Sequence, residues 1–278
     1  MTTSFDNLQS SIVISVYQDE ATLRLILDSL QKQTVDNFEV IISEDGQSDA
    51  IKKCVNDYLK PIPGLKHLSQ EDDGFRKTVA LNRAIRSCST DHLIFIDGDC
   101  VPHPAFIAAH QTLAAPGIAC TGRRAEIGKT TSEKLRNRSL AISSLTNRFS
   151  YLLNTVSLLK DKTKNIECGL YSMTLHALTK NRKIRILGSN FSCDRQDLIK
   201  INGFNEDYLA PGIGEDSDID WRLRKSGVVV KNVKFCAIQY HLYHVKHYHP
   251  SETNMAIFNE TKRSDDYLCQ NGLEYIEK

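Results

Sequence analysis

The first hundred residues alternate between short apolar runs and longer segments in which apolar residues recur every three or four positions. The apolar runs are rich in β-branched residues, which is typical of buried strands, and they cover 12–17, 38–43, 65–68 and 92–96. The segments between them predict helices, each with one apolar face, near 23–30, 51–59 and 81–88. Strands that alternate with helices in this way predict an α/β fold with a mostly parallel, doubly wound central sheet flanked by helices.

Acidic residues follow three successive predicted strands. Glu44-Asp45 follows the second, Asp72-Asp73 the third, and Asp97-Gly98-Asp99 the fourth. In sheets of this kind ligands bind beyond the carboxyl ends of the strands. Clustered carboxylates repel one another unless a cation compensates them, and oxygen-rich sites suit Mg²⁺ or Mn²⁺. The alternative is that these residues only cap helices. Capping is a weaker explanation for the third cluster, because Pro102 and Pro104 place the start of the next helix several residues downstream.

A second set of polar residues lies late in the chain. Gly212-Ile213-Gly214 precedes Glu215 and Asp216, which begin a predicted helix that ends before Gly227. Acids in a first helical turn are favoured by the helix dipole in any case. The two glycines favour a site instead, because glycine lets the backbone approach a ligand closely.

Four histidines follow the apolar run 235–240, at positions 241, 244, 247 and 249. Such a cluster could indicate zinc. We disfavour zinc because no acid or cysteine stands with the histidines at zinc-motif spacing.

These motifs together resemble the family-2 glycosyltransferases of GT-A fold, a Rossmann-like α/β architecture. The resemblance covers about 12–125 and 186–245. The family usually has Asp-Asp-Gly-Ser where this chain has Glu44-Asp45-Gly46-Gln47. The run 70–77 is similar to the subgroup of chondroitin-polymerase-like bacterial enzymes.

The resemblance implies a function. It implies transfer of a hexosyl or N-acetylhexosaminyl group, with inversion, from a nucleotide sugar (a UDP-sugar is expected) to a carbohydrate or glycolipid acceptor. The process implied is bacterial surface polysaccharide synthesis, with Mn²⁺ or Mg²⁺ as cofactor and no nucleic-acid partner.

The resemblance also implies roles for single residues. Asp216 would be the general base, with Glu215 as the alternative. Asp99 and Asp97, completed by His241 or His244, would hold the metal. The residues implied to contact the donor are Tyr17, Glu20, Asp45, Arg76, Asp97, Gly98, Asn190 and Gly214. For Arg76, a solvated surface position is an equal alternative.

Two other functions stay open. The strand that ends in Asp97-Gly98-Asp99 also fits a phosphohydrolase with Asp97 as its nucleophile, although such a nucleophile normally follows the first strand. A non-catalytic nucleotide-sugar sensor would keep the same pocket without turnover.

The middle of the chain differs from both ends. Residues 129–185 contain twelve Lys or Arg against three acids, on a chain whose net charge is +1, and their leucines indicate helices. Such a basic helical insert could bind an anionic acceptor or an anionic membrane surface, or form a solvated basic face. We therefore expect a nucleotide-sugar-binding half at 1–125, the insert at 126–185, an acceptor and catalytic half at 186–250 and a helical tail at 251–278.

The composition fits a globular protein, with 41% hydrophobic and 25% charged residues. The balanced charge argues against a general nucleic-acid binder. We find no signal-peptide pattern and no membrane-spanning run. Eight scattered cysteines without a C-x-x-C pair indicate reduced core residues, so we expect a cytoplasmic protein that can be peripheral at the inner face of the membrane.

Overall fold

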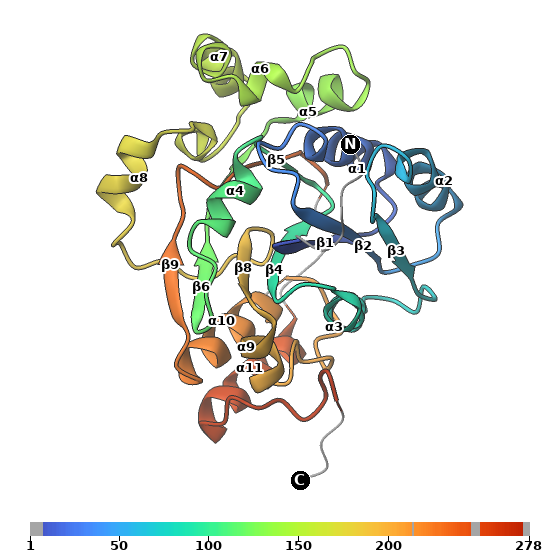
Figure 1. Ribbon diagram of the computed structural model, residues 1–278, viewed down its shortest axis with the longest axis vertical. Helices are drawn as coiled ribbons and strands as arrows, with labels where there is room; N and C mark the ends of the chain where they lie inside the picture. Colours follow the sequence, from blue (N-terminus) through green and yellow to red (C-terminus); the bar gives the residue numbers. More distant parts are fainter. Residues whose placement is uncertain (1–7, 213, 246–250, 275–278) are drawn as a thin grey trace.

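The computed structural model describes residues 8–212, 214–245 and 251–274. In this part of the chain the central feature is a seven-stranded sheet with the order β3-β2-β1-β4-β8-β6-β9 (Figure 1). Its strands are β1 (Ser10–Val16), β2 (Phe38–Glu44), β3 (Lys66–Ser69), β4 (His92–Asp97), β6 (Ile118–Thr121), β8 (Phe191–Asp194) and β9 (Val229–Asn232).

The four predicted strands and the three predicted helices between them are present. Strand β1 pairs in parallel with β2 and with β4, and β2 pairs in parallel with β3. The helices between them are α1 (Glu20–Leu30), α2 (Asp49–Tyr58) and α3 (Lys77–Ser87). Asp19 caps α1 by accepting from the backbone of Thr22, and Ser48, rather than Asp49, caps α2. The prediction of a mostly parallel α/β sheet is therefore confirmed.

Strand β8 is the antiparallel member of this sheet, between β4 and β6. The run 186–192 predicts a strand that glycine approaches, but β8 begins only at Phe191. The preceding residues form an irregular segment in which the amide of Gly188 donates to Asp216, at 2.9 Å. A backbone group used in this way is not available to a strand ladder.

A second, three-stranded sheet has the order β5-β10-β7. Its strands are β5 (Cys100–Pro102), β7 (Arg123–Glu126) and β10 (Ile238–His241). Strand β10 pairs antiparallel with β5 and parallel with β7. Segments far apart in sequence therefore meet where β4 leads into β5.

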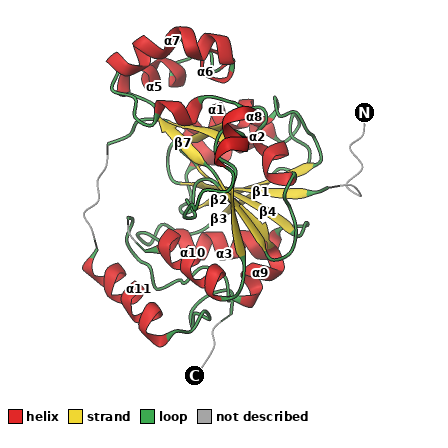
Figure 2. Cartoon of the chain, turned by 90° about the vertical axis from the view of Figure 1, so that its left-hand side faces the viewer, coloured by secondary structure: helices red, strands yellow, loops and turns green. Residues whose placement is uncertain are grey.

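Helices cover both faces of the large sheet (Figure 2). Helices α1 and α2 enclose one apolar core with strands β1, β2 and β4. Helix α3, with α9 (Arg195–Lys200) and α10 (Glu215–Lys225), encloses a second core on the other face. Helix α4 (Phe106–Gln111) lies beside β4. The eight cysteines are buried and free, as expected.

The basic insert is helical, as predicted. It contains α5 (Lys129–Arg136), α6 (Ser143–Thr146), α7 (Arg148–Lys160), the 3-10 turn η2 (Ile166–Gly169) and α8 (Met173–Thr179). Helices α5 to α7 form the top of the molecule in Figure 1. Near the C-terminus α11 (Glu252–Ser264) ends before Tyr267 and Leu268, which were expected to be helical. Among the described residues, no helix has the length and apolarity that a membrane crossing needs.

Candidate active site

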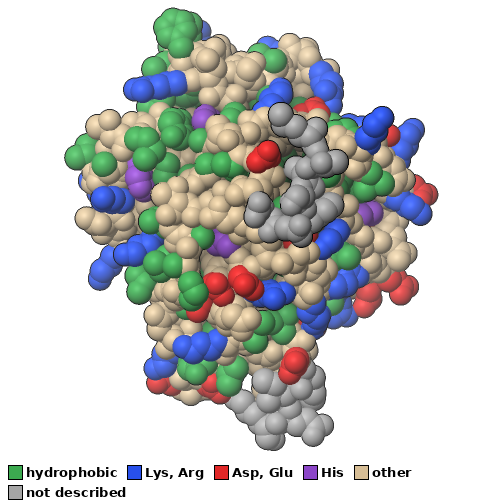
Figure 3. Space-filling view, viewed as in Figure 1, with side chains coloured by type: hydrophobic (Ala, Val, Ile, Leu, Met, Phe, Trp, Pro, Cys, Tyr) green, Lys and Arg blue, Asp and Glu red, His purple; other side chains and the backbone are tan. Residues whose placement is uncertain are grey.

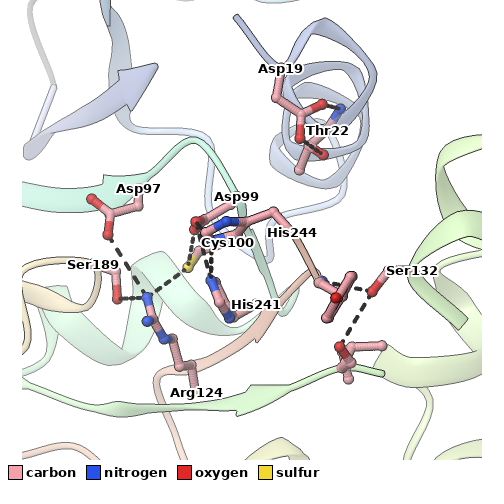
Figure 4. A network of polar contacts seen from close by, with 12 residues as sticks. Asp19, Thr22, Asp97, Asp99, Cys100, Arg124, Ser132, Ser189, His241 and His244 are labelled. Carbon is pink, nitrogen blue, oxygen red and sulfur yellow. Dashed lines mark hydrogen bonds and ion pairs between the residues drawn. The ribbon is translucent and has the colours of Figure 1, made fainter. Parts of the chain in front are cut away.

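Asp99, His241 and His244 meet where the two sheets join. Asp99 lies in the turn between β4 and β5, and His241 ends β10, opposite Cys100 in the β5–β10 register. One carboxylate oxygen of Asp99 lies 3.1 Å from Nε2 of His241 and 3.2 Å from Nε2 of His244. One ligand atom from each residue lies within 4.8 Å of the other two, which is close enough to share one ion (Figure 4).

The electrostatics of this cluster favour a charged carboxylate. Burial raises the pKa of Asp99, but hydrogen bonds from His241 and His244 outweigh it and hold that pKa well below its ordinary value. The thiol of Cys100 donates to the other oxygen of Asp99, at 3.0 Å. One carboxylate oxygen and two imidazole nitrogens fit a divalent cation.

Asp97 lies apart from this cluster, although it was expected to share the metal. Its carboxylate accepts from Nζ of Lys77 at 2.9 Å and lies 3.8 Å from Arg124. Arg124 also donates to Ser189, at 3.0 Å, as Figure 4 shows. Asp97 is therefore compensated by two basic side chains, while the two histidines accompany Asp99 alone.

Glu215 and Asp216 lie in the first turn of α10, as predicted. Asp216 is half-buried, and the amide of Gly188 donates to its carboxylate. A Cβ atom on Gly188 would collide with that carboxylate, so this close approach needs glycine. The carboxylate of Asp216 is thus oriented by a hydrogen bond from a backbone amide and not by an ion pair with a basic side chain among the described residues.

Glu215 is more deeply buried, with 8% of its surface exposed. Burial raises its pKa to about 7, against the opposing charge of Lys77, and the neighbouring Asp216 adds to the rise. Lys77 lies 3.7 Å from one oxygen of Glu215. The other oxygen is buried without a hydrogen-bond partner in the part of the chain that the structure describes. This oxygen is available to a bound hydroxyl group.

A small pocket lies between Lys77, Asp97 and the first turn of α10. Its polar lining comes from Ser15, Lys77, Asp97, Gly188, Glu215 and Asp216, and its apolar lining from Leu81, Phe95, Ile96, Phe191 and Phe204. Gly98 follows Asp97, and a Cβ atom on it would meet the carbonyl oxygen of Ser15 at 2.8 Å. Gly214, the residue before α10, has φ of +147° and packs on the ring of Tyr208. Both glycines permit close backbone packing beside the pocket.

The residues predicted to hold the nucleotide surround a second region, at the ends of β1 and β2. Asp45 is buried and accepts from Gln70 and from the amide of Arg76, each at 2.8 Å. Tyr17 is 55% exposed, and its hydroxyl donates to Asp72. Its ring lies beside Gly46. An exposed ring next to a buried carboxylate can receive a flat, hydrogen-bonding base.

Three residues that were predicted to contact the nucleotide sugar, namely Arg76, Glu20 and Asn190, bond to other groups of the protein. The guanidinium of Arg76 is bonded to Asp73 at the surface, which matches the alternative reading of that residue. Glu20 pairs with Arg24 along α1.

Asn190 is fully buried. Its amide group donates to two backbone carbonyls, and its oxygen bonds His110. We therefore correct its predicted role: these bonds hold the segment before β8 in place, and the buried side chain is not exposed to a donor.

Two basic residues of the site were missed by sequence reasoning. Lys77 directly follows Arg76 in the noted 70–77 run, so its position was a usable signal. Arg124 lies on the short strand β7, whose sequence has no apolar pattern, so nothing in the sequence indicated it. His247 and His249, and Ile213 of the glycine motif, lie outside the described residues.

The fold and site together define a mixed α/β protein with a cluster of one acid and two histidines where its two sheets join. The model of glycosyl transferase family 2 matches residues 11–177, and the chain belongs to this family. A second model, the N-terminal domain of galactosyltransferase, matches residues 172–247, which include α10 and β10. The predicted family is confirmed, and the phosphohydrolase alternative has no support in these matches.

Curated relatives agree with this assignment. The chain is 26% identical over 239 residues to the chondroitin synthase of Escherichia coli, covering 83% of this chain and 34% of that protein. It is 27% identical to the validoxylamine A glucosyltransferase of Streptomyces hygroscopicus subsp. limoneus, covering 78% of this chain and 48% of that protein. The hyaluronan synthase of Pasteurella multocida is 24% identical, over 80% of this chain and 23% of that protein. The chain thus spans less than half of each of these relatives.

Solved structures confirm the GT-A fold. The mannosyltransferase PcManGT from Pyrobaculum calidifontis, in complex with GDP-Man and Mn²⁺, has a TM-score of 0.54 at 16% identity, covering 86% of this chain and 58% of that one. GalNAc-T7, with UDP, GalNAc and Mn²⁺, has a TM-score of 0.59 at 14% identity, covering 93% of this chain and 48% of that one.

Proposed function

We propose that this glycosyltransferase moves a sugar from a UDP-sugar to a hydroxyl group of a carbohydrate or glycolipid, with inversion at the anomeric carbon. The observation that carries the proposal is the pairing of two groups of side chains in one site. Asp99, His241 and His244 can hold a cation, and Asp97, two residues before Asp99, lines a pocket together with Glu215 and Asp216. The relatives named as polysaccharide synthases support a carbohydrate acceptor in bacterial polysaccharide synthesis.

The cation would be held by Asp99, His241 and His244, and Mn²⁺ is favoured because both solved structures of similar fold contain it. When bound, a divalent ion at this position neutralises the negative charge that develops on the departing diphosphate. Arg124 and Lys77 add positive charge next to the ligand set, through their contacts with Asp97. Asp97 in this arrangement orients both basic side chains and is available to the ribose hydroxyls.

Asp216 would act as the general base. Its carboxylate lines the pocket and is oriented by the Gly188 amide, so it can accept a proton from an acceptor hydroxyl as that oxygen attacks. Glu215 would bind a hydroxyl group through its unpartnered oxygen, and it is the alternative base. A base opposite the leaving diphosphate gives inversion, because attack and departure occur on opposite faces of the sugar.

Two of the expected segments have separate roles in this proposal. Residues 1–125 would bind the nucleotide sugar through Asp45, Tyr17 and Gly98, and residues 186–250 would bind the acceptor and carry the base. The buried free thiols support a reducing compartment such as the cytoplasm.

The ligand set is tested by metal-dependent donor binding. Calorimetric titration with UDP-sugars, GDP-sugars and dTDP-sugars, with and without Mn²⁺, should show tighter binding of a UDP-sugar when Mn²⁺ is present. In Asp99→Asn and His241→Gln this gain should fall by at least about tenfold, because each variant removes one ligand. His176→Gln, a histidine remote from the cluster, is the matched control. Equal affinities with and without Mn²⁺ would remove the metal from the proposal.

Turnover by an Asp216→Asn variant separates an enzyme from a sensor. The variant should bind donor normally and lose about a hundredfold or more in kcat, because the amide cannot accept the acceptor proton. Asp220→Asn, one turn further along α10, is the control. Proton couplings in the NMR spectrum of the product should show an inverted linkage. A retained linkage, or turnover that is indifferent to Asp216, would contradict the mechanism.

A further inference from the structure

Helix α7 exposes an apolar face to solvent. Leu152, Leu153, Val156 and Leu159 are 51%, 67%, 62% and 55% exposed, and Phe149 is 69% exposed. Their spacing of three and four residues places these side chains along one side of the helix. Figure 3 shows hydrophobic side chains with Lys and Arg beside them at the top of the molecule, where Figure 1 places α7. Contiguous apolar surface of this kind marks an interaction site in a soluble domain.

The exposed face cannot turn into the core, because the opposite face of α7 is already packed there. Tyr151 and Leu158 are each 2% exposed and belong to the core formed around α1 and β10. The hydroxyl of Tyr151 donates to the carbonyl of Ile166, at 2.7 Å. Helix α7 therefore has apolar residues on two opposite faces, and one of these faces is packed against the core. The other face contacts solvent, so a partner that covers it must come from outside the described residues.

Positive charge lies at both ends of this face. Arg148 begins α7, Lys160 ends it, and Lys162 and Lys164 follow it. None of these four forms an ion pair with another residue that the structure describes. The nearby carboxylate of Asp161 is occupied by the backbone amides at the start of α5. Arg148 also lies at the helix end where the dipole disfavours a cation, so helix stability does not explain it.

We propose that α7 docks on an anionic lipid bilayer, with its exposed apolar side chains in the interfacial region and its basic residues on the headgroups. An apolar helix face flanked by Lys and Arg is the pattern of interfacial helices, and anionic lipid attracts cations close to the surface. A second copy of the chain would fit less well, because two faces each flanked by four cations would repel one another. This proposal concerns a surface separate from the transfer site and does not depend on the reaction.

Docking at α7 would also position the active site. Lys164 pairs with Glu126, the last residue of β7, through backbone hydrogen bonds of 2.9 Å in both directions. The hydroxyl of Tyr240 on β10 donates to carbonyls of Leu145 and Gly169 in the insert. The insert is thus joined to the small sheet whose strand β10 ends in His241. A membrane bound at α7 would hold that sheet at a fixed orientation to the lipid surface.

Co-sedimentation of the whole chain with lipid vesicles tests the proposal. The protein should sediment with vesicles of phosphatidylcholine and phosphatidylglycerol at low salt, and much less with phosphatidylcholine alone. Phe149→Gln combined with Leu153→Gln should weaken binding by roughly tenfold or more, because less apolar area enters the interface. Lys160→Gln combined with Lys162→Gln should weaken it by roughly fivefold for each charge removed.

Matched surface variants on α2 serve as controls. Leu59→Gln, where the leucine is 50% exposed just after α2, and Lys52→Gln combined with Lys53→Gln should leave vesicle binding unchanged. All these positions are exposed, so circular dichroism and melting should show intact folding. Absence of binding to anionic vesicles at low salt, or binding that the α7 variants leave unchanged, would overturn the proposal. A lipid-free dimer that Phe149→Gln combined with Leu153→Gln dissociates would assign the face to a second copy instead.

Discussion

Lys77 is the side chain that allows two acidic groups of the site to lie close together. Its ammonium group contacts both Asp97 and Glu215, and its own side chain is only 18% exposed. Burial lowers the pKa of Lys77, but the carboxylates of Asp97, Glu215 and Asp216 outweigh this and raise it above its ordinary value, so the residue stays charged. At the scale of single residues, the positive charge of Lys77 therefore compensates the negative charges of Asp97 and Glu215 inside the site.

Replacing Lys77 by methionine should destabilise the fold by about 3 kcal/mol or more, because the carboxylates would be left buried without their cation. The pKa of Glu215, already raised to about 7, should rise further. An acid whose folded pKa exceeds its unfolded pKa loses stability as pH rises, so the deficit should be larger above pH ~7 than below it. Chemical denaturation at several pH values measures this.

The control for Lys77 is Lys225→Met. Lys225 pairs with Asp265 at the surface, where both side chains are well exposed. Its loss should cost less than about 1 kcal/mol at every pH. An equal effect of the two variants would contradict the account of the buried charges.

At the scale of elements, His110 joins helix α4 to strand β8. Its ring is fully buried, and its two nitrogens bond the hydroxyl of Ser192 and the side-chain oxygen of Asn190, at 2.9 and 3.1 Å. Burial lowers the pKa of His110 to about 3, with a smaller contribution from His92. The neutral ring is thus part of the packing between these two elements.

Acid should weaken this junction. The unfolded chain binds a proton at His110 below pH ~6.5, whereas the folded chain resists it down to about pH 3, so stability falls as pH decreases through this window. His110→Gln should reduce the slope of unfolding free energy against pH by up to about 1.4 kcal/mol per pH unit. Ser192→Ala removes one of the same hydrogen bonds without removing a titrating group, and should lower stability while keeping the slope. A slope unchanged in His110→Gln would show that the histidine is not the acid-sensitive group.

At the scale of the whole molecule, Tyr240 connects the helical insert to the small sheet. Its ring is fully buried on β10, and its hydroxyl donates to the carbonyls of Leu145 and Gly169 at 2.7 and 3.1 Å. Tyr240→Phe should lower the free energy of unfolding by about 1–3 kcal/mol, because two buried carbonyls lose the one hydroxyl hydrogen that they share. Hydrogen exchange should accelerate at 143–170 and stay unchanged in β1 and β2.

Tyr58→Phe is the matched control for this connection. The hydroxyl of Tyr58 bonds Asp28 between α2 and α1, so its loss should lower stability modestly without affecting exchange in the insert. Faster exchange in the insert of both variants would mean that Tyr240 is not its specific anchor.

The sequence by itself determined the first four strands, the helices between them and the family. The parallel units were readable because buried strand residues such as Ile12–Val16 are nearly all apolar and each helix repeats its apolar face. Asp99, Glu215 and Asp216 were readable because they lie in local motifs at strand or helix ends. The helical nature of the basic insert followed from its spaced leucines in the same way.

Only the tertiary structure decided which charges meet. Asp97 and Asp99 are two residues apart, yet one faces Lys77 and Arg124 while the other faces His241 and His244. Arg124 reaches the site through the pairing of β7 with β10, a contact between residues more than a hundred positions apart. Local periodicity carries no information on such pairings, because they depend on how strands from distant segments register in one sheet. The apolar outer face of α7 was decided in the same way, since which side of a doubly apolar helix is buried depends on what packs against it.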